Sequence, residues 1–129
     1  MSRVLVIDDE TVVGTILRYA FEVGGHQTVV ADGGRAGIDM ARSEHPDAIV
    51  LDLMMPSVNG YDVLGILRDD EATKQVPILV LTAVTMLRER DRCLSEGADM
   101  FMTKPFDPRD VATAVDALLS SEAAGSQSG

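Results

Sequence analysis

Short apolar runs alternate with helical patterns along the whole chain, and this alternation limits the folds that are open to it. Five runs have the length and aliphatic composition of strands covered on both faces. They lie at residues 4–7, 28–31, 47–53, 76–82 and 100–102. Apolar residues recur at helical spacing at residues 10–23, 34–44, around 63–67, at about 86–96 and from 108 to 119. Five such units with short connections predict an α/β fold, a parallel sheet with helices on both faces.

Length and charge narrow the functions that such a fold can serve. The 129 residues suit one domain, which we place at residues 1–120. Residues 121–129 contain nothing large and apolar, so we expect a flexible tail or the start of a linker. The net charge of −10 disfavours binding to nucleic acid and to anionic membrane surfaces.

The same composition bears on the compartment. No apolar run approaches the ~20 residues of a membrane span. The first apolar run, at residues 4–7, is too short for the core of a signal peptide. Cys93 is the single cysteine, so an internal disulfide bond is excluded. We therefore expect a cytoplasmic protein.

Polar side chains follow four of the predicted strands at the points where these strands end. Asp8 and Asp9 follow the first strand, Asp52 ends the third, Thr82 ends the fourth, and Lys104 follows the fifth. In doubly wound sheets the ligand site lies beyond the carboxyl ends of the strands. The sequence therefore predicts a pocket that holds three carboxylates, one hydroxyl and one ammonium group.

Three neighbouring carboxylates repel one another unless positive charge neutralises them. The Lys104 ammonium and a bound divalent cation are the two candidates. Mg²⁺ suits such a site because it prefers hard oxygen ligands and shares them with phosphoryl groups, and Mn²⁺ is the alternative. A carboxylate held beside such a cation is able to attack phosphorus and form an aspartyl phosphate.

Five motifs in this order resemble the receiver domain of two-component response regulators, over about residues 3 to 120. The motifs are Val4-Leu5-Val6-Ile7-Asp8-Asp9-Glu10, Leu51-Asp52-Leu53-Met54-Met55-Pro56 with Asn59-Gly60, Thr82-Ala83, Gly97-Ala98-Asp99, and Lys104-Pro105-Phe106. Each is weak alone, but together they are specific. The resemblance implies a doubly wound five-stranded parallel sheet with the flavodoxin-like strand order 2-1-3-4-5.

The resemblance also implies roles for the acidic residues. Asp52 would be the phosphoacceptor. Asp9 would bind Mg²⁺ directly, and Asp8 mostly through water. Asp52 and the backbone carbonyl of Met54 would complete the protein ligands. The phosphoryl group would come from a histidine kinase or a phosphotransfer protein, and the chain would catalyse only its own slow dephosphorylation.

A switch is implied by the same likeness. Thr82 would hydrogen-bond the phosphoryl group, Lys104 would pair with it, and the Lys104–Pro105 peptide bond would be cis. Phe101 would then turn into the space behind Thr82. The surface of the fourth helix, fifth strand and fifth helix would change and bind a downstream protein or an output domain, or form a homodimer on phosphorylation.

Two other functions stay open from the residues alone. A flavodoxin-like cofactor-binding protein needs a phosphate-cradling loop rich in Ser, Thr and Gly after the first strand, whereas this loop is Asp-Asp-Glu. A metal-dependent phosphatase with an Asp nucleophile would normally carry a second acidic residue two positions later, where Met54 stands. The chain also fits either a complete single-domain regulator or the receiver part of a longer one.

Overall fold

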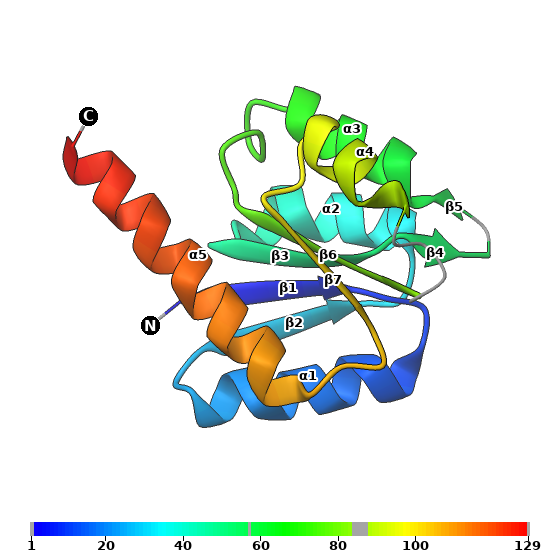
Figure 1. Cartoon of the computed structure of the whole chain (residues 1–129), viewed down its shortest axis with the longest axis horizontal. Helices are drawn as coiled ribbons and strands as arrows, with labels where there is room; N and C mark the ends of the chain where they lie inside the picture. Colours follow the sequence, from blue (N-terminus) through cyan, green and yellow to red (C-terminus); the bar gives the residue numbers. More distant parts are fainter. Residues whose placement is uncertain (1, 57, 84–87, 129) are drawn as a thin grey trace.

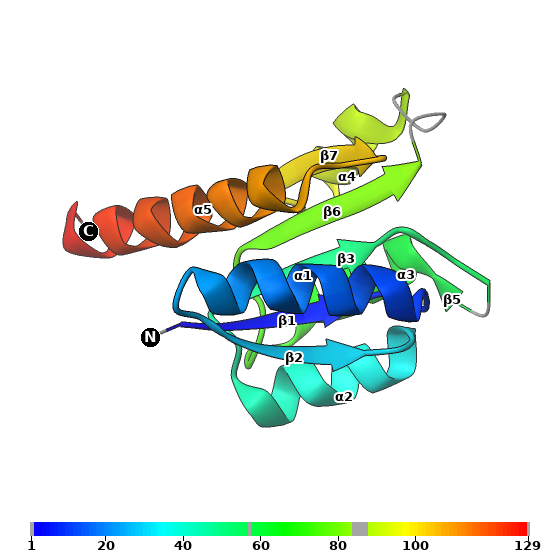
Figure 2. The same ribbon diagram turned by 90° about the horizontal axis from the view of Figure 1, so that it is seen from below.

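The computed structural model describes residues 2–56, 58–83 and 88–128, whose main feature is a five-stranded parallel sheet (Figure 1). Its strands are β1 (Arg3–Ile7), β2 (Gln27–Ala31), β3 (Ala48–Asp52), β6 (Ile78–Ala83) and β7 (Met100–Lys104). The order across the sheet is β2-β1-β3-β6-β7, and all arrows point the same way (Figure 2). This confirms the predicted order 2-1-3-4-5.

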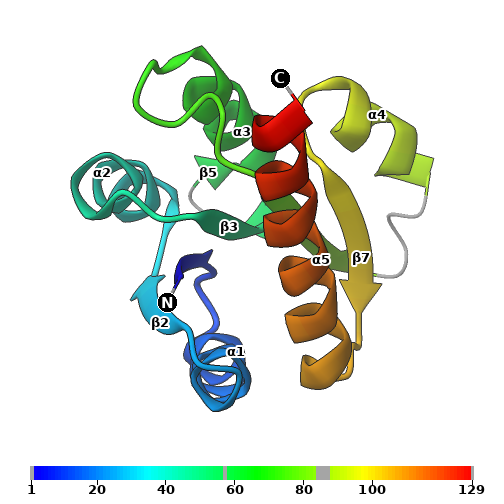
Figure 3. The ribbon, with the colours of Figure 1, turned by 90° about the vertical axis from the view of Figure 1, so that its left-hand side faces the viewer.

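Helices cover both faces of the sheet, as predicted. They are α1 (Thr11–Val23), α2 (Gly34–Glu44), α3 (Gly60–Asp69), α4 (Arg90–Ser95) and α5 (Pro108–Ser128). The helices α1 and α5 lie on one face, and α2, α3 and α4 lie on the other (Figure 3). Every helix in the described part of the chain is too short or too polar to span a membrane.

Each face of the sheet has its own hydrophobic core. Strand side chains alternate between the two faces, so Val4 and Val6 pack under α1 and α5, while Leu5 and Ile7 pack under α2 and α3. The side chains of β1 are buried from Val4 to Ile7, because helices cover both faces there. This double coverage explains why the strands read as continuous apolar runs and not as an alternating pattern.

Local signals fix where several helices begin and end. The N–H of Gly24 donates to the carbonyl of Ala20 at the end of α1, and Gly25 follows with φ of 89°. At the start of α5, Asp107 Oδ1 accepts a hydrogen bond from the N–H of Arg109 at 2.9 Å. Asp107 therefore caps the first turn of α5.

Three details differ from the pattern in the sequence. A two-stranded antiparallel ladder of β4 (Met54–Met55) and β5 (Val58–Asn59) has no counterpart among the predicted strands, because two-residue strands are too short to show a periodicity. The helix α4 begins at Arg90, after a 3₁₀ turn at residues 88–89, and the predicted start near residue 86 lies outside the described residues.

The third difference concerns the end of the chain. The backbone of α5 stays helical through Ser128, past the last apolar residue of its core-facing side, Leu119. Alanine and glutamate, both good helix formers, occur in this stretch. The division of the chain at residue 120 stays a prediction.

Candidate functional site

The strand register brings the predicted site residues to one edge of the sheet. Asp52 lies beside Leu81, so that Thr82 follows at the same edge, and Lys104 pairs with Ala83. Asp8 comes directly after the paired part of β1. Both aspartates are only 2% exposed. The site therefore lies beyond the carboxyl ends of β1, β3, β6 and β7.

The Lys104 ammonium group lies among three carboxylates. Its Nζ atom is 3.2 Å from Asp8 Oδ2, 3.3 Å from Asp52 Oδ2 and 3.1 Å from Glu10 Oε1. The Lys104 side chain is 20% exposed, while those of Asp8 and Asp52 are nearly closed to solvent. These contacts connect residues that are far apart in the sequence and confirm that the fold brings Asp8, Asp52 and Lys104 together.

Backbone groups orient the two buried aspartates. Asp8 Oδ1 accepts a hydrogen bond from the N–H of Glu10 at 2.8 Å. Asp52 Oδ1 accepts one from the N–H of Met54 at 3.0 Å. Each carboxylate thus has one oxygen held by its own loop, and its second oxygen is directed to Lys104.

Burial changes the acidity of this cluster. Desolvation raises the pKa of Asp52 to about 6, against the hydrogen bond from Met54, and the charge of Asp8 raises the pKa further. Desolvation works against the protonated form of Lys104. The hydrogen bond to Glu10 and the charges of Asp52 and Asp8 outweigh this effect, so the pKa of Lys104 is raised. Lys104 therefore stays protonated near neutral pH, while ionisation of the buried Asp52 carboxyl group is unfavourable.

The donor set fits a divalent cation. Carboxylate oxygens of Asp8, Glu10 and Asp52 lie within 4.8 Å of one another. Three carboxylates and Lys104 sum to −3 + 1 = −2 when all are ionised. Hard oxygen ligands with this residual charge match the requirements of Mg²⁺.

The membership of this cluster differs from the predicted ligand set. Asp9, predicted as the direct metal ligand, is half-buried and is not in the group, while Glu10 is. The sequence reasoning included Glu10 in a motif but gave it no role. The signal was present, because Glu10 extends the run of acidic residues after β1.

The two residues predicted to switch lie on neighbouring strands. Thr82 is fully buried, and within the described ranges its Oγ1 atom has no hydrogen-bond partner. Phe101 is half-buried on β7, where it is paired with Val80. A buried hydroxyl group without a hydrogen-bond partner lowers the stability of the fold. Thr82 therefore gains a hydrogen bond when a polar group enters the site. The Lys104–Pro105 peptide bond is cis, as the resemblance implied.

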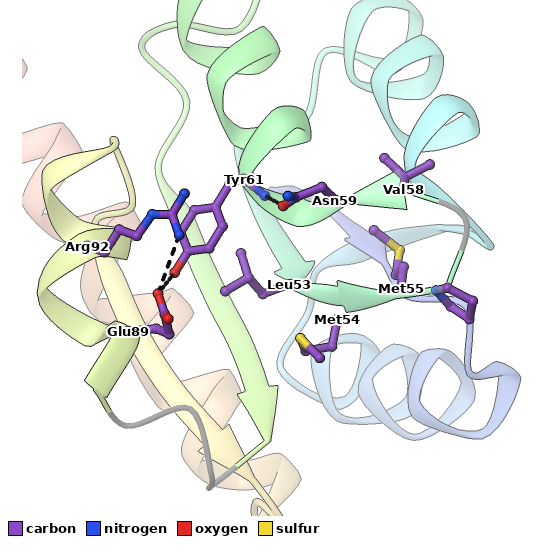
Figure 4. A pocket seen from close by; sticks show the side chains of 9 residues that line it. Leu53, Met54, Met55, Val58, Asn59, Tyr61, Glu89 and Arg92 are labelled. Carbon is purple, nitrogen blue, oxygen red and sulfur yellow. Dashed lines mark hydrogen bonds and ion pairs between the residues drawn. The ribbon is translucent and has the colours of Figure 1, made fainter.

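An open pocket of about 680 Å³ adjoins the site on the side of the β4–β5 ladder (Figure 4). Leu53 and Met54, which follow Asp52, form part of its wall. Tyr61 from α3 and Arg92 from α4 form the wall across from them. The pocket thus lies between the residues that follow Asp52 and the helix α4.

Comparison with known proteins identifies related sequences and folds. A family model described as the response regulator receiver domain matches residues 4–116. The alkaline phosphatase synthesis transcriptional regulatory protein PhoP of Bacillus subtilis is 40% identical over 118 residues, which are 92% of this chain and 48% of PhoP. The DNA-binding dual master transcriptional regulator RpaA of Synechocystis sp. is 38% identical over 119 residues, 92% of this chain and 49% of RpaA.

This chain spans about half the length of the curated relatives it matches. Among solved structures, the receiver domain of the Francisella response regulator 1452 superposes with a TM-score of 0.86 at 30% sequence identity. The match covers 94% of this chain and 98% of that domain.

Proposed function

Because this chain belongs to the response regulator receiver domain family, we propose that Asp52 accepts a phosphoryl group from a phosphohistidine donor and that the chain acts as a signalling receiver. The observation that carries the proposal is the position of Asp52. It is buried at the end of a central strand, with one oxygen held by a backbone N–H and the other 3.3 Å from a lysine ammonium.

The proposed transfer needs no oxidant or further reactant. A carboxylate oxygen of Asp52 attacks the phosphorus atom, and the bond between phosphorus and the imidazole nitrogen of the donor breaks. The electron pair of that bond stays on the nitrogen, and Asp52 becomes an aspartyl phosphate. The Lys104 ammonium stabilises the negative charge on the transferring group. Hydrolysis of this acyl phosphate by water is the only reaction that we assign to the chain alone.

A divalent ion is part of this proposal. We assign Asp9, Asp52 and the carbonyl of Met54 as its ligands, with Asp8 acting through water and Glu10 as an additional candidate. Bound Mg²⁺ or Mn²⁺ supplies positive charge for the phosphoryl oxygens and for the carboxylates. The cluster of acidic oxygens around Asp52 supports this assignment.

The donor is proposed to be a histidine kinase or a phosphotransfer protein. Four large side chains on one face of α1 are exposed, although they are apolar or aromatic: Val12, Ile16, Tyr19 and Val23. Their spacing puts them in one stripe along the helix, which starts next to Glu10. An exposed apolar stripe beside the carboxylate site is a suitable docking surface for a donor protein.

The output is proposed to pass through Thr82 and Phe101. A phosphoryl group adds roughly −1.5 to −2 charges at Asp52 and strong acceptor oxygens, which the buried hydroxyl of Thr82 can bind. Movement of Thr82 leaves space for Phe101, and the surface formed by α4, β7 and α5 changes with it. This surface would then bind a downstream protein or an output domain, or a second phosphorylated copy. We assign no nucleic-acid contact to this acidic chain itself.

Intact mass spectrometry tests the phosphoacceptor. The chain is treated with a small acyl phosphate and Mg²⁺, beside the variants Asp52→Asn and Asp69→Asn. Asp69 is an exposed aspartate at the end of α3 and serves as the matched control. Wild type and the control are expected to gain one phosphoryl mass, and Asp52→Asn none. Equal gain by all three, or none by wild type, would refute the assignment.

A further inference from the structure

A group of four side chains joins the first turn of α3 to α4, and we call it the α3–α4 latch: Tyr61, Glu89, Arg92 and Cys93. Tyr61, Glu89 and Arg92 line the pocket in Figure 4. The Tyr61 hydroxyl donates a hydrogen bond to Glu89 Oε2. The Arg92 guanidinium lies over the Tyr61 ring, 3.8 Å from the ring centroid. The Cys93 thiol donates to the Tyr61 oxygen at 3.7 Å. One side chain of α3 is thus held by three residues at or near the start of α4.

Ion pairs within α4 and the turn before it position the charged side chains of the latch. Arg92 lies 3.8 Å from Glu89 and 2.9 Å from Glu96. These ion pairs hold the guanidinium over the ring of Tyr61 and keep the Glu89 carboxylate near the phenol. Burial and the hydrogen bond to Glu89 raise the pKa of Tyr61, so the phenol remains a donor at neutral pH.

Tyr61, the residue of the latch that comes from α3, is held near the carboxylate site by a backbone contact of its neighbour. Gly60 precedes Tyr61, and its N–H donates to the carbonyl of Leu53 at 3.2 Å. A Cβ atom at Gly60 would lie 2.5 Å from that carbonyl oxygen, so the backbones are in direct contact. Because Leu53 directly follows Asp52 in the chain, Tyr61 is unable to move far without disturbing the strand that carries Asp52.

The other three residues of the latch come after Thr82 in the chain, in α4 or in the turn before it. Glu89 lies on the connection between β6 and α4, and Thr82 ends the fully buried part of β6. The hydroxyl of Thr82 has no hydrogen-bond partner in the described part of the chain, so a polar group at Asp52 can draw it from its present position. Glu89 follows Thr82 by seven positions in the chain.

We propose that the α3–α4 latch holds α4 against α3 in the unphosphorylated chain and opens when a phosphoryl group on Asp52 draws Thr82 toward it. The latch and the phosphoryl group thus compete for the position of α4. Tyr61 is a positioning residue in this scheme, because it does not touch the reacting atoms. The inference rests on the proposed function of Asp52, since the competing ligand binds there.

The test compares how tightly beryllium fluoride, an analogue of the phosphoryl group, binds in the presence of Mg²⁺. The substitution Tyr61→Phe keeps the ring under Arg92 and removes the hydrogen bond to Glu89. Loss of a hydrogen bond to a charged acceptor in the resting state is expected to make the analogue bind about fivefold more tightly by calorimetry. Glu89→Gln is expected to act in the same direction with a smaller effect.

Asp91→Asn is the matched control. It removes a carboxylate from the exposed side of the same helix without touching the latch, so its affinity for the analogue is expected to equal that of wild type. Unchanged or weaker binding by Tyr61→Phe would overturn the proposal. So would equal effects of Glu89→Gln and Asp91→Asn.

A second measurement separates this inference from the proposed function. Amide hydrogen exchange of residues 90–95 is measured without any phosphoryl analogue, and Tyr61→Phe is expected to exchange faster than wild type there. If wild type does not bind the analogue, the proposed function fails, and the latch is judged by exchange alone. Unchanged exchange in Tyr61→Phe would then refute the latch as well.

Discussion

At the scale of single residues, Asp52 carries the least favourable charge in the site, and this has a consequence for stability. Its folded pKa of about 6 lies above the ordinary value of 3.8, so the folded chain holds a proton that the unfolded chain releases. Stability is therefore expected to fall as pH rises from about 4 to about 6, and to stay reduced above that. Metal-free protein should show this most clearly, because Lys104 is then the main compensating charge.

The variant Asp52→Asn tests this expectation. Without Mg²⁺ it is expected to be more stable than wild type by about 3 kcal/mol near pH 7, and to show little difference near pH 4. Urea unfolding at the two pH values measures both free energies. A gain of equal size at both would contradict a charge effect, and Asp69→Asn shows what an exposed aspartate contributes.

Residue-level prediction from the sequence succeeded where the fold itself determines proximity. Asp8, Asp52 and Lys104 were grouped because parallel strands end at one edge, and the distances of 3.2 Å and 3.3 Å confirm this. Glu10 was missed because its contact with Lys104 depends on how a long side chain turns, which no periodicity encodes. Tyr61 was not identified either.

The pairing of Tyr61 with Glu89 shows the limit of such reasoning. The two residues lie on different elements, and each alone reads as an ordinary surface position. Their contact depends on the separation of α3 and α4, which is set by packing on β6 and β7. The sequence pattern describes each element and not this separation.

At the scale of elements, the exposed stripe on α1 leads to a second prediction. Ile16→Asp places a charge within the stripe and is expected to lower phosphoryl transfer from a phosphorylated histidine phosphotransfer protein about tenfold. Phosphorylation by a small acyl phosphate should stay unchanged, because the carboxylate site is not altered. Rates of both reactions are followed by intact mass.

Arg18→Ala is the control for charge. It lowers the net charge by the same amount on the same helix but lies outside the stripe, so both rates should match wild type. A similar loss in both variants would indicate a general electrostatic effect and not docking at the stripe.

Element boundaries were predictable to different degrees. The helices α1 and α2 lie where their periodicity predicted, since each has one clear buried face and Gly24 ends α1. The predicted start of α4 near residue 86 lies outside the described residues. The helix itself has six residues and a charged sequence with one buried side chain, Cys93. A helix with so little buried surface leaves a weak pattern.

At the scale of the whole molecule, the strand order follows from the alternation of elements and the resemblance together. Helices on both faces of a parallel sheet were deduced from the alternation, while the order 2-1-3-4-5 came from the likeness to receiver domains. The structure confirms both. The β4–β5 ladder could not be deduced, because each of its strands has two residues.

The net charge of −10 leads to a third prediction, which concerns the effect of Mg²⁺ on the stability of the whole molecule. Mg²⁺ binding to the acidic site should raise the stability of the folded chain, by about 2.7 kcal/mol at a concentration one hundred times the dissociation constant. Thermal unfolding with and without Mg²⁺ measures the effect, and a chelator should reverse it.

The controls separate a specific site from screening of the acidic surface. NaCl at matched ionic strength screens all charges equally and is expected to give a smaller shift. Asp52→Asn should lose most of the response to Mg²⁺. Equal shifts with Mg²⁺ and NaCl, in wild type and variant alike, would argue against a metal site at this edge.

The placement of lysines in this sheet has a practical consequence. The sequence contains two of them, Lys104 and Lys74. Lys104 is held among carboxylates and its pKa is raised, so its amine is a poor nucleophile near neutral pH. Lys74 lies in the loop between α3 and β6, at the edge opposite the carboxylates. Amine-reactive coupling through Lys74 would attach the molecule to a sensor surface by the edge of the sheet opposite the carboxylates. The acidic pocket would then face the solution.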